Sequence, residues 1–188
     1  MTWQDAVAGL RSADAVAVTE PATGLMDHAS FADFYERSAK GLWAYLARVS
    51  GDAALADDLM QESFVRFLCG AHPAEGEVAC RKYLFRIATN LMRDHWRQAK
   101  TSSIDELPEE MLTARNVEGE AENRATLERA MVGLRPRDRQ ILWLAHAEGY
   151  THQEIAEITG LGAASLRLLL FRARRKLADR LRADGGAR

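Results

Sequence analysis

The most informative stretch of the chain lies toward its C-terminal end and reads Gly149-Tyr150-Thr151-His152-Gln153-Glu154-Ile155-Ala156-Glu157-Ile158-Thr159-Gly160. Thr151 and Glu154 have the spacing of a capping box, in which the threonine hydroxyl accepts a hydrogen bond from a free backbone amide and the glutamate reaches back. The stretch therefore predicts a short helix that ends at Gly160. A tight turn and a last helix over about residues 163–182 would complete a helix-turn-helix arrangement. An ordinary helical hairpin is the simpler alternative.

The residues that precede this stretch predict two more helices. Apolar residues recur at helical spacing from near Asn123, and this helix stops before Pro136. Proline suits the first position of a helix because the amide hydrogen that it lacks would have no partner there. Pro136 therefore opens a helix over residues 137–148, and Gly149 ends it. The apolar positions expected inside this unit are Leu127, Ala130, Met131, Leu134, Ile141, Leu142, Leu144, Ala145, Ile155, Ala156, Ile158, Leu161, Leu166, Leu170, Ala173 and Leu177.

Three further helices are expected in the N-terminal half of the chain. The first begins near Phe31 and ends at Ser50-Gly51-Asp52, and its apolar residues recur at threes and fours. The second covers residues 52–69 and the third residues 77–100. The loop between them, residues 70–76, is indicated by its glycine and proline content.

These patterns divide the chain into two helical units with no strand. Residues 28–100 form the first unit and residues 123–188 the second. The segment 101–122 is acidic and loses apolar periodicity, so it is expected to be a linker. Residues 1–27 form an N-terminal extension. The expected fold class is all-α, with two small helical domains joined by an acidic linker.

Composition excludes several classes of protein. No apolar run among the 188 residues approaches the roughly 20 residues that a membrane-spanning helix needs. The N-terminus has no basic start and carries early acidic residues, which argues against a secretory signal. The two cysteines, Cys69 and Cys80, are too few for a disulfide framework and lack CxxC spacing. A reducing cytosol therefore suits the chain best.

The net charge of −2 conceals a strong segregation of charge along the chain. Residues 1–80 hold 5 basic and 12 acidic side chains, and residues 101–126 hold 2 and 7. In contrast, residues 81–100 hold 6 basic and 1 acidic, and residues 127–188 hold 12 and 7. Two basic segments are thus nearly cancelled by acidic ones, and such segregation is what an electrostatic footprint on a polyanion requires.

The first basic segment is the helix over residues 77–100. A helical projection places on one face Lys82, Arg86, Thr89, Arg93, Trp96, Arg97 and Lys100. The opposite face is expected to be core and carries Cys80, Leu84, Ile87, Ala88, Leu91 and His95. Within residues 81–100 only Asp94 offsets the cations, and the aromatic rings of Tyr83, Phe85 and Trp96 could stack on unpaired bases. A solvated surface is the alternative to a nucleic-acid site.

The second basic segment is the last helix. Its cluster from Arg172 to Lys176 would meet phosphates, which orient a protein on DNA without reading its sequence. The outward face also carries Leu168 and Phe171. These side chains could touch thymine methyl groups but cannot hydrogen-bond base edges, and an exposed apolar pair can equally mark a protein contact. Both possibilities stay open.

The helix over residues 52–69 is acidic on one side. Asp57, Asp58, Gln61 and Glu62 crowd together there, against an apolar side. Paired carboxylates could bind metal or catalyse, but no His or Cys stands at ligand spacing and no HExxH or phosphate-binding loop is present. A docking surface for a protein partner is the better interpretation, and the chain is expected to be no enzyme and to need no metal or cofactor.

Four motifs in order resemble those of bacterial extracytoplasmic-function sigma factors of the sigma-70 family. They are residues 57–66, residues 83–95, residues 149–160 and residues 172–177, and the match spans roughly residues 31–182. The chain departs from the family at Tyr83, where Trp is usual, at Gly162, where Ser or Thr commonly caps the last helix, and at Leu168 and Leu169, where small polar and basic residues are common.

The resemblance implies a role for each segment. Region 2 would bind the clamp helices of the largest polymerase subunit through Asp57, Asp58, Leu59, Gln61, Glu62, Phe64 and Val65. It would open the −10 promoter element with Arg81, Lys82, Tyr83, Arg86, Asn90, Arg93, Trp96 and Arg97. Region 4 would contact the −35 element with Thr151, Gln153, Ser165, Arg167, Leu168, Arg172, Arg174 and Arg175.

Further partners and roles follow from the same resemblance. The chain would join core RNA polymerase, including its flap, bind promoter DNA in the cytoplasm, and be held by an anti-sigma factor, without membrane insertion. The loop 70–76 would help to hold a flipped base, and the linker 101–122 would thread toward the polymerase active centre.

Two other functions are compatible with parts of the sequence. A helix-turn-helix regulator that never joins polymerase would bind duplex DNA through the C-terminal unit alone. A metal-dependent hydrolase would depend on Asp58 or Glu62, although metal-ligand spacing is missing. Because the chain is acidic overall and has only two short basic faces, it is expected to bind free duplex poorly and to act mainly once polymerase holds both faces.

Overall fold

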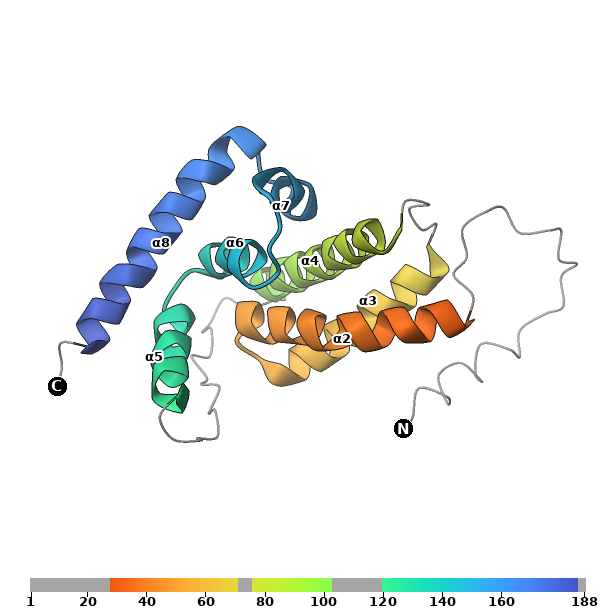
Figure 1. Cartoon of the computed structure of the whole chain (residues 1–188), viewed down its shortest axis with the longest axis horizontal. Helices are drawn as coiled ribbons and strands as arrows, with labels where there is room; N and C mark the ends of the chain where they lie inside the picture. The colour runs from red at the N-terminus through yellow and green to blue at the C-terminus, as the bar shows by residue number, and fades with distance from the viewer. Residues whose placement is uncertain (1–27, 71–75, 103–119, 186–188) are drawn as a thin grey trace, which may run out of the picture.

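The computed structural model describes residues 28–70, 76–102 and 120–185, and Figure 1 shows their arrangement. These ranges contain helices and no strand. The helices are α2 (His28–Ser50), α3 (Ala53–Cys69), α4 (Glu77–Ser102), α5 (Glu120–Val132), α6 (Pro136–His146), α7 (His152–Thr159) and α8 (Ala163–Gly185). The all-α prediction is confirmed. The N-terminal extension and most of the predicted loop and linker lie outside the described residues.

The helix ends are set by short-range interactions that were visible in the sequence. At the start of α3 the Asp52 carboxylate accepts a hydrogen bond from the Leu55 amide, at 3.1 Å. Gly51, at φ +83°, makes the turn before it, in a region that glycine enters without steric cost. Pro136 occupies the first turn of α6, where its missing amide hydrogen leaves no bond unmade.

The predicted capping box at the start of α7 is present. The Thr151 hydroxyl accepts from the Glu154 amide at 3.3 Å, and the Glu154 carboxylate accepts from the Thr151 amide at 2.8 Å. The Thr151 amide, and also the Thr151 hydroxyl at 2.8 Å, donate to the Glu154 carboxylate, so they favour its charged form and lower the pKa of Glu154. The helix ends at Gly160, whose left-handed φ of +70° allows the chain to turn toward α8.

Aromatic side chains hold α2, α3 and α4 together. The rings of Phe34 and Phe67 stack with centroids 5.0 Å apart and join α2 to α3. Tyr45 and Phe85 meet at 5.3 Å and join α2 to α4. All four are fully or almost fully buried, so they form the centre of the N-terminal unit.

The C-terminal unit is built on α8. Its inward stripe of Leu166, Leu170 and Ala173 is buried, as the sequence predicted. The helices α5, α6 and α7 all pack against α8, with α5 near its C-terminal end, as Figure 1 shows. Burying a leucine side chain stabilises a fold by about 2 kcal/mol, so Leu166 and Leu170 contribute substantially to holding this unit together.

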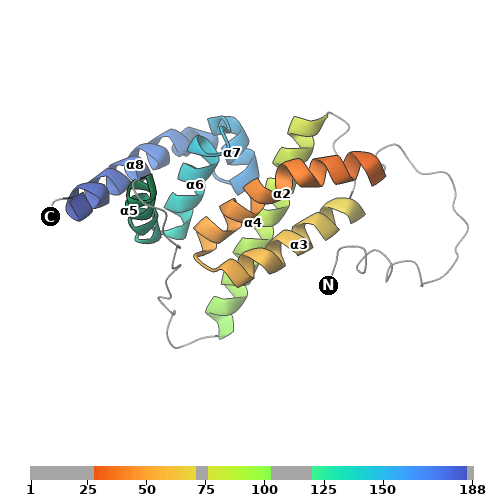
Figure 2. The same cartoon turned by 60° about the horizontal axis from the view of Figure 1, so that its bottom comes forward.

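The two units pack directly on one another and share one hydrophobic core. Figures 1 and 2 show α6 beside α2 and α7 beside α4. The Gln140 side-chain amide of α6 donates to the Tyr45 hydroxyl of α2 at 2.7 Å, and that hydroxyl is 2.7 Å from Thr89 Oγ1 of α4. Burial raises the Tyr45 pKa to about 12, so the hydroxyl keeps its proton and can donate to Thr89. The sequence had indicated two units but not this contact.

The buried arc of α4 differs from the one predicted. Thr89 was expected on the basic face and Phe85 among the base-stacking rings, but both are buried, because α2 and the C-terminal unit cover that side of the helix. Trp96 packs partly against the core. His95 was expected in the core and is exposed, because the end of α4 extends beyond α2 and α3 (Figure 2).

Candidate nucleic-acid and protein interfaces

The acidic side of α3 forms an open surface. Asp57, Asp58, Gln61, Glu62 and Val65 are all exposed. Asp57 accepts a hydrogen bond from the Trp43 indole at 2.7 Å, and Glu62 pairs with Arg66 at 2.7 Å along the helix. The exposed valine adds an apolar side chain about one turn beyond these carboxylates, and such a mixture of charged and apolar side chains is the character of a protein-docking surface.

Two residues of the predicted docking set do not belong to this surface. Leu59 and Phe64 are 7 % and 5 % exposed. Phe64 packs against Tyr35 and Phe31 of α2, with ring centroids 4.7 and 6.2 Å away. Their side chains face the core because it supplies the apolar contacts that α3 needs. They can position the acidic surface from behind but cannot reach a partner in this conformation.

The predicted −10 residues of α4 fall into two groups. Arg86, Asn90, Arg93 and Arg97 are exposed along one arc of the helix, and Arg97 pairs with Asp94 one turn away. The others are half-buried, and they are Arg81, Lys82, Tyr83 and Trp96. The Tyr83 ring lies 6.1 Å from the Phe67 ring, so it contacts its own unit. The predicted face is therefore only partly open to a ligand.

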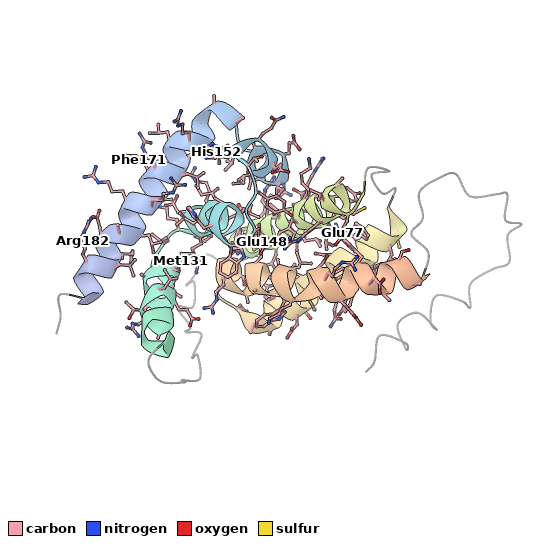
Figure 3. All side chains as sticks on the ribbon, in the orientation of Figure 1. Glu77, Met131, Glu148, His152, Phe171 and Arg182 are labelled. Atoms are coloured by element: carbon pink, nitrogen blue, oxygen red, sulfur yellow. The ribbon has the colours of Figure 1, made fainter. Side chains whose placement is uncertain are left out.

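Three cations of this face are bonded to the C-terminal unit. Arg81 Nη2 lies 2.6 Å from Glu148 Oε2, and Lys82 Nζ lies 2.8 Å from Glu157 Oε2. Arg93 Nη2 donates to the carbonyl oxygen of Thr159 at 2.8 Å. Figure 3 labels Glu148 next to α4, where the chain leaves α6 toward α7.

The acceptors of these bonds were missed by the sequence reasoning. Glu148 and Glu157 had been counted only as part of the charge of the C-terminal unit. A signal was present, because both stand in or next to the helix-turn-helix of an otherwise basic unit. The partner of each could not be inferred from sequence, since 67 and 75 residues separate the bonded pairs.

The predicted −35 residues lie on two helices and the turn before α7. Those on α8 are all exposed, and they are Ser165, Arg167, Leu168, Arg172, Arg174 and Arg175. Gln153 and Thr151 are exposed as well, although the Thr151 hydroxyl is already used as the cap of α7. Arg174 donates to His146 at 3.1 Å, which fixes its direction. The outer face of α8 thus carries four exposed arginines, Arg167, Arg172, Arg174 and Arg175.

An apolar pair lies among these exposed arginines. Leu168 is 50 % exposed and Phe171 is 61 % exposed, as the helical projection predicted. Figure 3 shows Phe171 on the side of α8 that faces away from the other helices. Exposed large apolar side chains of this kind lose their contact with water only when a ligand covers them.

The described residues hold no group of three or more His, Cys, Asp or Glu side chains that could bind a metal ion. No helix among the described ranges is long and apolar enough to span a membrane. Neither Cys69 nor Cys80 is part of a disulfide, and the first is exposed while the second is buried.

Comparison with known proteins identifies the class. The family model for sigma-70 region 2 matches residues 34–101, and the model for sigma-70 region 4 matches residues 124–177. The chain is 30 % identical to the ECF RNA polymerase sigma factor EcfG of Rhodopseudomonas palustris over 146 residues, which cover 77 % of this chain and 81 % of that one. It is 28 % identical to the sigma factor CarQ of Myxococcus xanthus over 155 residues, which cover 81 % and 89 %.

A solved structure shares the fold. The sigma factor RpoE of Bartonella quintana, in complex with the anti-sigma factor NepR, superposes with a TM-score of 0.63 over 82 % of this chain and 98 % of that chain, at 18 % identity. With two sigma-70 regions in order and a relative at 30 % identity, the chain belongs to the extracytoplasmic-function sigma factors of the sigma-70 family. It is an RNA polymerase sigma factor, a subunit for transcription initiation.

Proposed function

We propose that this sigma factor recruits core polymerase through the acidic surface of α3, opens the −10 element with α4 and contacts the −35 element with α8. It carries no catalytic activity of its own and acts in the cytoplasm. The observation that carries the proposal is the presence of regions 2 and 4 in one chain, with the acidic surface of region 2 exposed.

Recruitment is an electrostatic and apolar docking event. The carboxylates of Asp58 and Glu62 attract a basic partner helix, and Val65, at 47 % exposure, supplies an apolar contact further along α3. Charged rims mainly guide encounter and orientation, whereas a buried apolar centre supplies affinity. This division suits a subunit that must bind polymerase and later leave it.

Promoter opening makes and breaks no covalent bond. The guanidinium groups of Arg86, Arg93 and Arg97 lie along one arc of α4 and can bind the phosphates of the displaced strand. Unstacking a base costs a few kcal/mol, and capture of the unpaired strand by these contacts offsets that cost. The reaction is therefore driven by binding energy.

Region 4 would position α8 on duplex DNA through arginine–phosphate contacts. Arg172, Arg174 and Arg175 supply the charge, while Leu168 and Phe171 supply an apolar contact in place of hydrogen bonds to base edges. An anti-sigma factor is the further partner that we propose, because the same apolar pair is accessible to a protein.

Leu168→Arg is expected to change the relative use of promoters by about tenfold, since a good base contact contributes roughly 1–3 kcal/mol of discrimination. Transcription from promoters with randomised −35 sequences measures the change. Arg182→Ala is the control, because Arg182 is exposed on the same helix and lies outside the predicted set. An unchanged promoter profile together with unchanged anti-sigma binding would show that Leu168 takes no part in either contact.

Co-purification of the full chain with core polymerase, followed by transcription start mapping, tests the proposal. A stable complex that starts at defined promoters is the expected result. A chain that binds duplex DNA alone and forms no complex with polymerase would instead be a separate helix-turn-helix regulator.

A further inference from the structure

The contact between the two units uses the same side chains that we assign to the −10 element. Arg81, Lys82 and Arg93 each donate to an oxygen of the C-terminal unit, at 2.6, 2.8 and 2.8 Å. These are the distances of charge-assisted hydrogen bonds. A phosphate of the displaced strand would have to bind the same cationic groups, which oxygens of the C-terminal unit already neutralise, so the two contacts compete at these positions.

All three acceptors come from one short segment, residues 148–159. Two are carboxylate oxygens, of Glu148 and Glu157, and the third is the carbonyl oxygen of Thr159 at the end of α7. They are bonded to cations spread from residue 81 to residue 93, over about 18 Å of helix. The segment thus presents a row of oxygen acceptors along α4, as the backbone of a nucleic acid would.

We propose that the segment 148–159 closes the −10 face by occupying, with its own oxygens, the cations that would otherwise bind DNA phosphates. The free sigma factor is therefore held in a self-inhibited form. This inference rests on the proposed role of α4 in promoter opening.

The contact between the segment 148–159 and α4 is built in a way that allows it to open. Two buried polar atoms within it, the Tyr150 hydroxyl oxygen and Arg81 Nε, have no hydrogen-bond partner. Leaving such atoms unpaired weakens the closed form relative to a fully satisfied interface. The Tyr150 ring packs edge-on against Phe85, with centroids 5.7 Å apart, so apolar contact supplements the polar bonds. A ligand that binds the same cations can displace the segment.

The closed form leaves the acidic surface of α3 free. Asp57, Asp58 and Val65 stay exposed while Arg81 and Lys82 are half-buried. Polymerase can therefore bind first, and the segment 148–159 must leave α4 before the −10 face is complete. The same order explains why the free chain is expected to bind DNA poorly.

The test removes the two carboxylates without altering any residue assigned to DNA or polymerase. The Glu148→Gln/Glu157→Gln chain loses both ion pairs but keeps side chains of the same shape, and glutamine can still accept the hydrogen bond that Glu148 receives from Trp143. The matched control is Glu77→Gln/Asp179→Asn. It also removes two acidic partners, of Arg37 and Arg182, but neither pair joins the two units.

The first readout is the affinity of the free, full-length chain for a labelled single-stranded DNA 20-mer of mixed sequence. Apparent affinity falls with the fraction of molecules in the binding-competent form, so if about one molecule in ten is open, the double variant should bind about tenfold more tightly than wild type. Each phosphate contact on a single strand adds about 0.7 to the salt dependence, so three released cations should steepen the slope of log affinity against log salt by about 2. The control variant should match wild type.

The second readout reports the closed form without DNA. Fluorescent labels at Glu36→Cys and Arg182→Cys, in a Cys69→Ser background that leaves only the buried Cys80, should move apart in the double variant. In the wild type a zero-length carbodiimide should join the Lys82 amine to the Glu157 carboxylate, which lie 2.8 Å apart. This cross-link should disappear when core polymerase and promoter DNA are added.

Equal DNA affinity and equal salt dependence for wild type and the double variant would overturn the proposal, and so would label separation without a gain in affinity. The same DNA assay on polymerase-bound wild type distinguishes an error in the proposed role of α4 from an error in the proposed self-inhibition. If it binds and opens promoters while the free variant gains nothing, α4 has its proposed role and only the self-inhibition is wrong. If it binds no single strand, the role of α4 itself is wrong and the inhibition is overturned with it.

Discussion

Replacing Arg86, Arg93 and Arg97 together with alanine is expected to abolish promoter opening while polymerase binding persists. All three are exposed on one arc of α4, and none contributes to the hydrophobic core, so the fold should survive. A hydrogen bond to a charged group contributes about 1.5 kcal/mol or more, so the loss of three should reduce open-complex formation by at least about a hundredfold. Permanganate footprinting of unpaired thymines on a promoter measures the opening.

Two features of this design make the outcome specific. Trp96 is left unchanged because it packs partly against the core and its loss would destabilise the domain. Arg93 also bonds to Thr159, but losing that bond releases α7 and would favour opening, so it cannot account for a defect. The control, Arg137→Ala/Arg180→Ala/Arg182→Ala, removes three exposed arginines outside the predicted sites. A triple variant that melts promoters as well as this control does would contradict the assignment of α4.

Asp58→Arg is expected to weaken binding to core polymerase by about a hundredfold, because a like charge placed against a basic partner costs several kcal/mol. The change should not harm the fold. Asp58 is exposed, arginine is a better helix former than aspartate, and the new side chain can pair with Glu62 one turn later. Titration of labelled sigma factor with core polymerase measures the affinity.

Asp179→Arg provides the matched control for this prediction. It makes the same change of charge at an exposed position on α8, in the other unit of the chain. Wild-type affinity is expected for the control. If both variants bind equally well, the acidic surface of α3 is not the docking site, and if both bind equally poorly, the effect is one of overall charge.

The sequence predicted well whatever depends on neighbours in the chain. Thr151 and Glu154 are three residues apart, and the hydrogen bonds that they make form in any chain that turns there. Pro136 and Gly160 act through their own backbone preferences in the same way. The helical period also placed Leu168 and Phe171 on the outer face of α8, because one side of that helix is covered by its own unit and the other is open.

Prediction failed where the environment of a side chain depends on residues that are distant in the sequence. A helical projection assumes one buried side, but α4 is covered by α2 and also by the C-terminal unit. For this reason Thr89 is buried although it was expected on the basic face, and Phe85 is buried although its ring was expected to stack on bases. His95 is exposed for the opposite reason, since no described helix covers that side of the end of α4.

By itself the sequence determined the all-α fold, the capping box of α7 and the segregation of charge behind the net value of −2. Only the tertiary structure decided which cations of α4 are available. The sequence around these cations does not show which of them bond to the C-terminal unit. In the folded chain the segment 148–159 accepts hydrogen bonds from Arg81, Lys82 and Arg93. Arg97 pairs with Asp94 of its own helix. The physical reason is that charge type is a property of a residue, whereas its pairing depends on which oxygen the folded chain brings within about 3 Å.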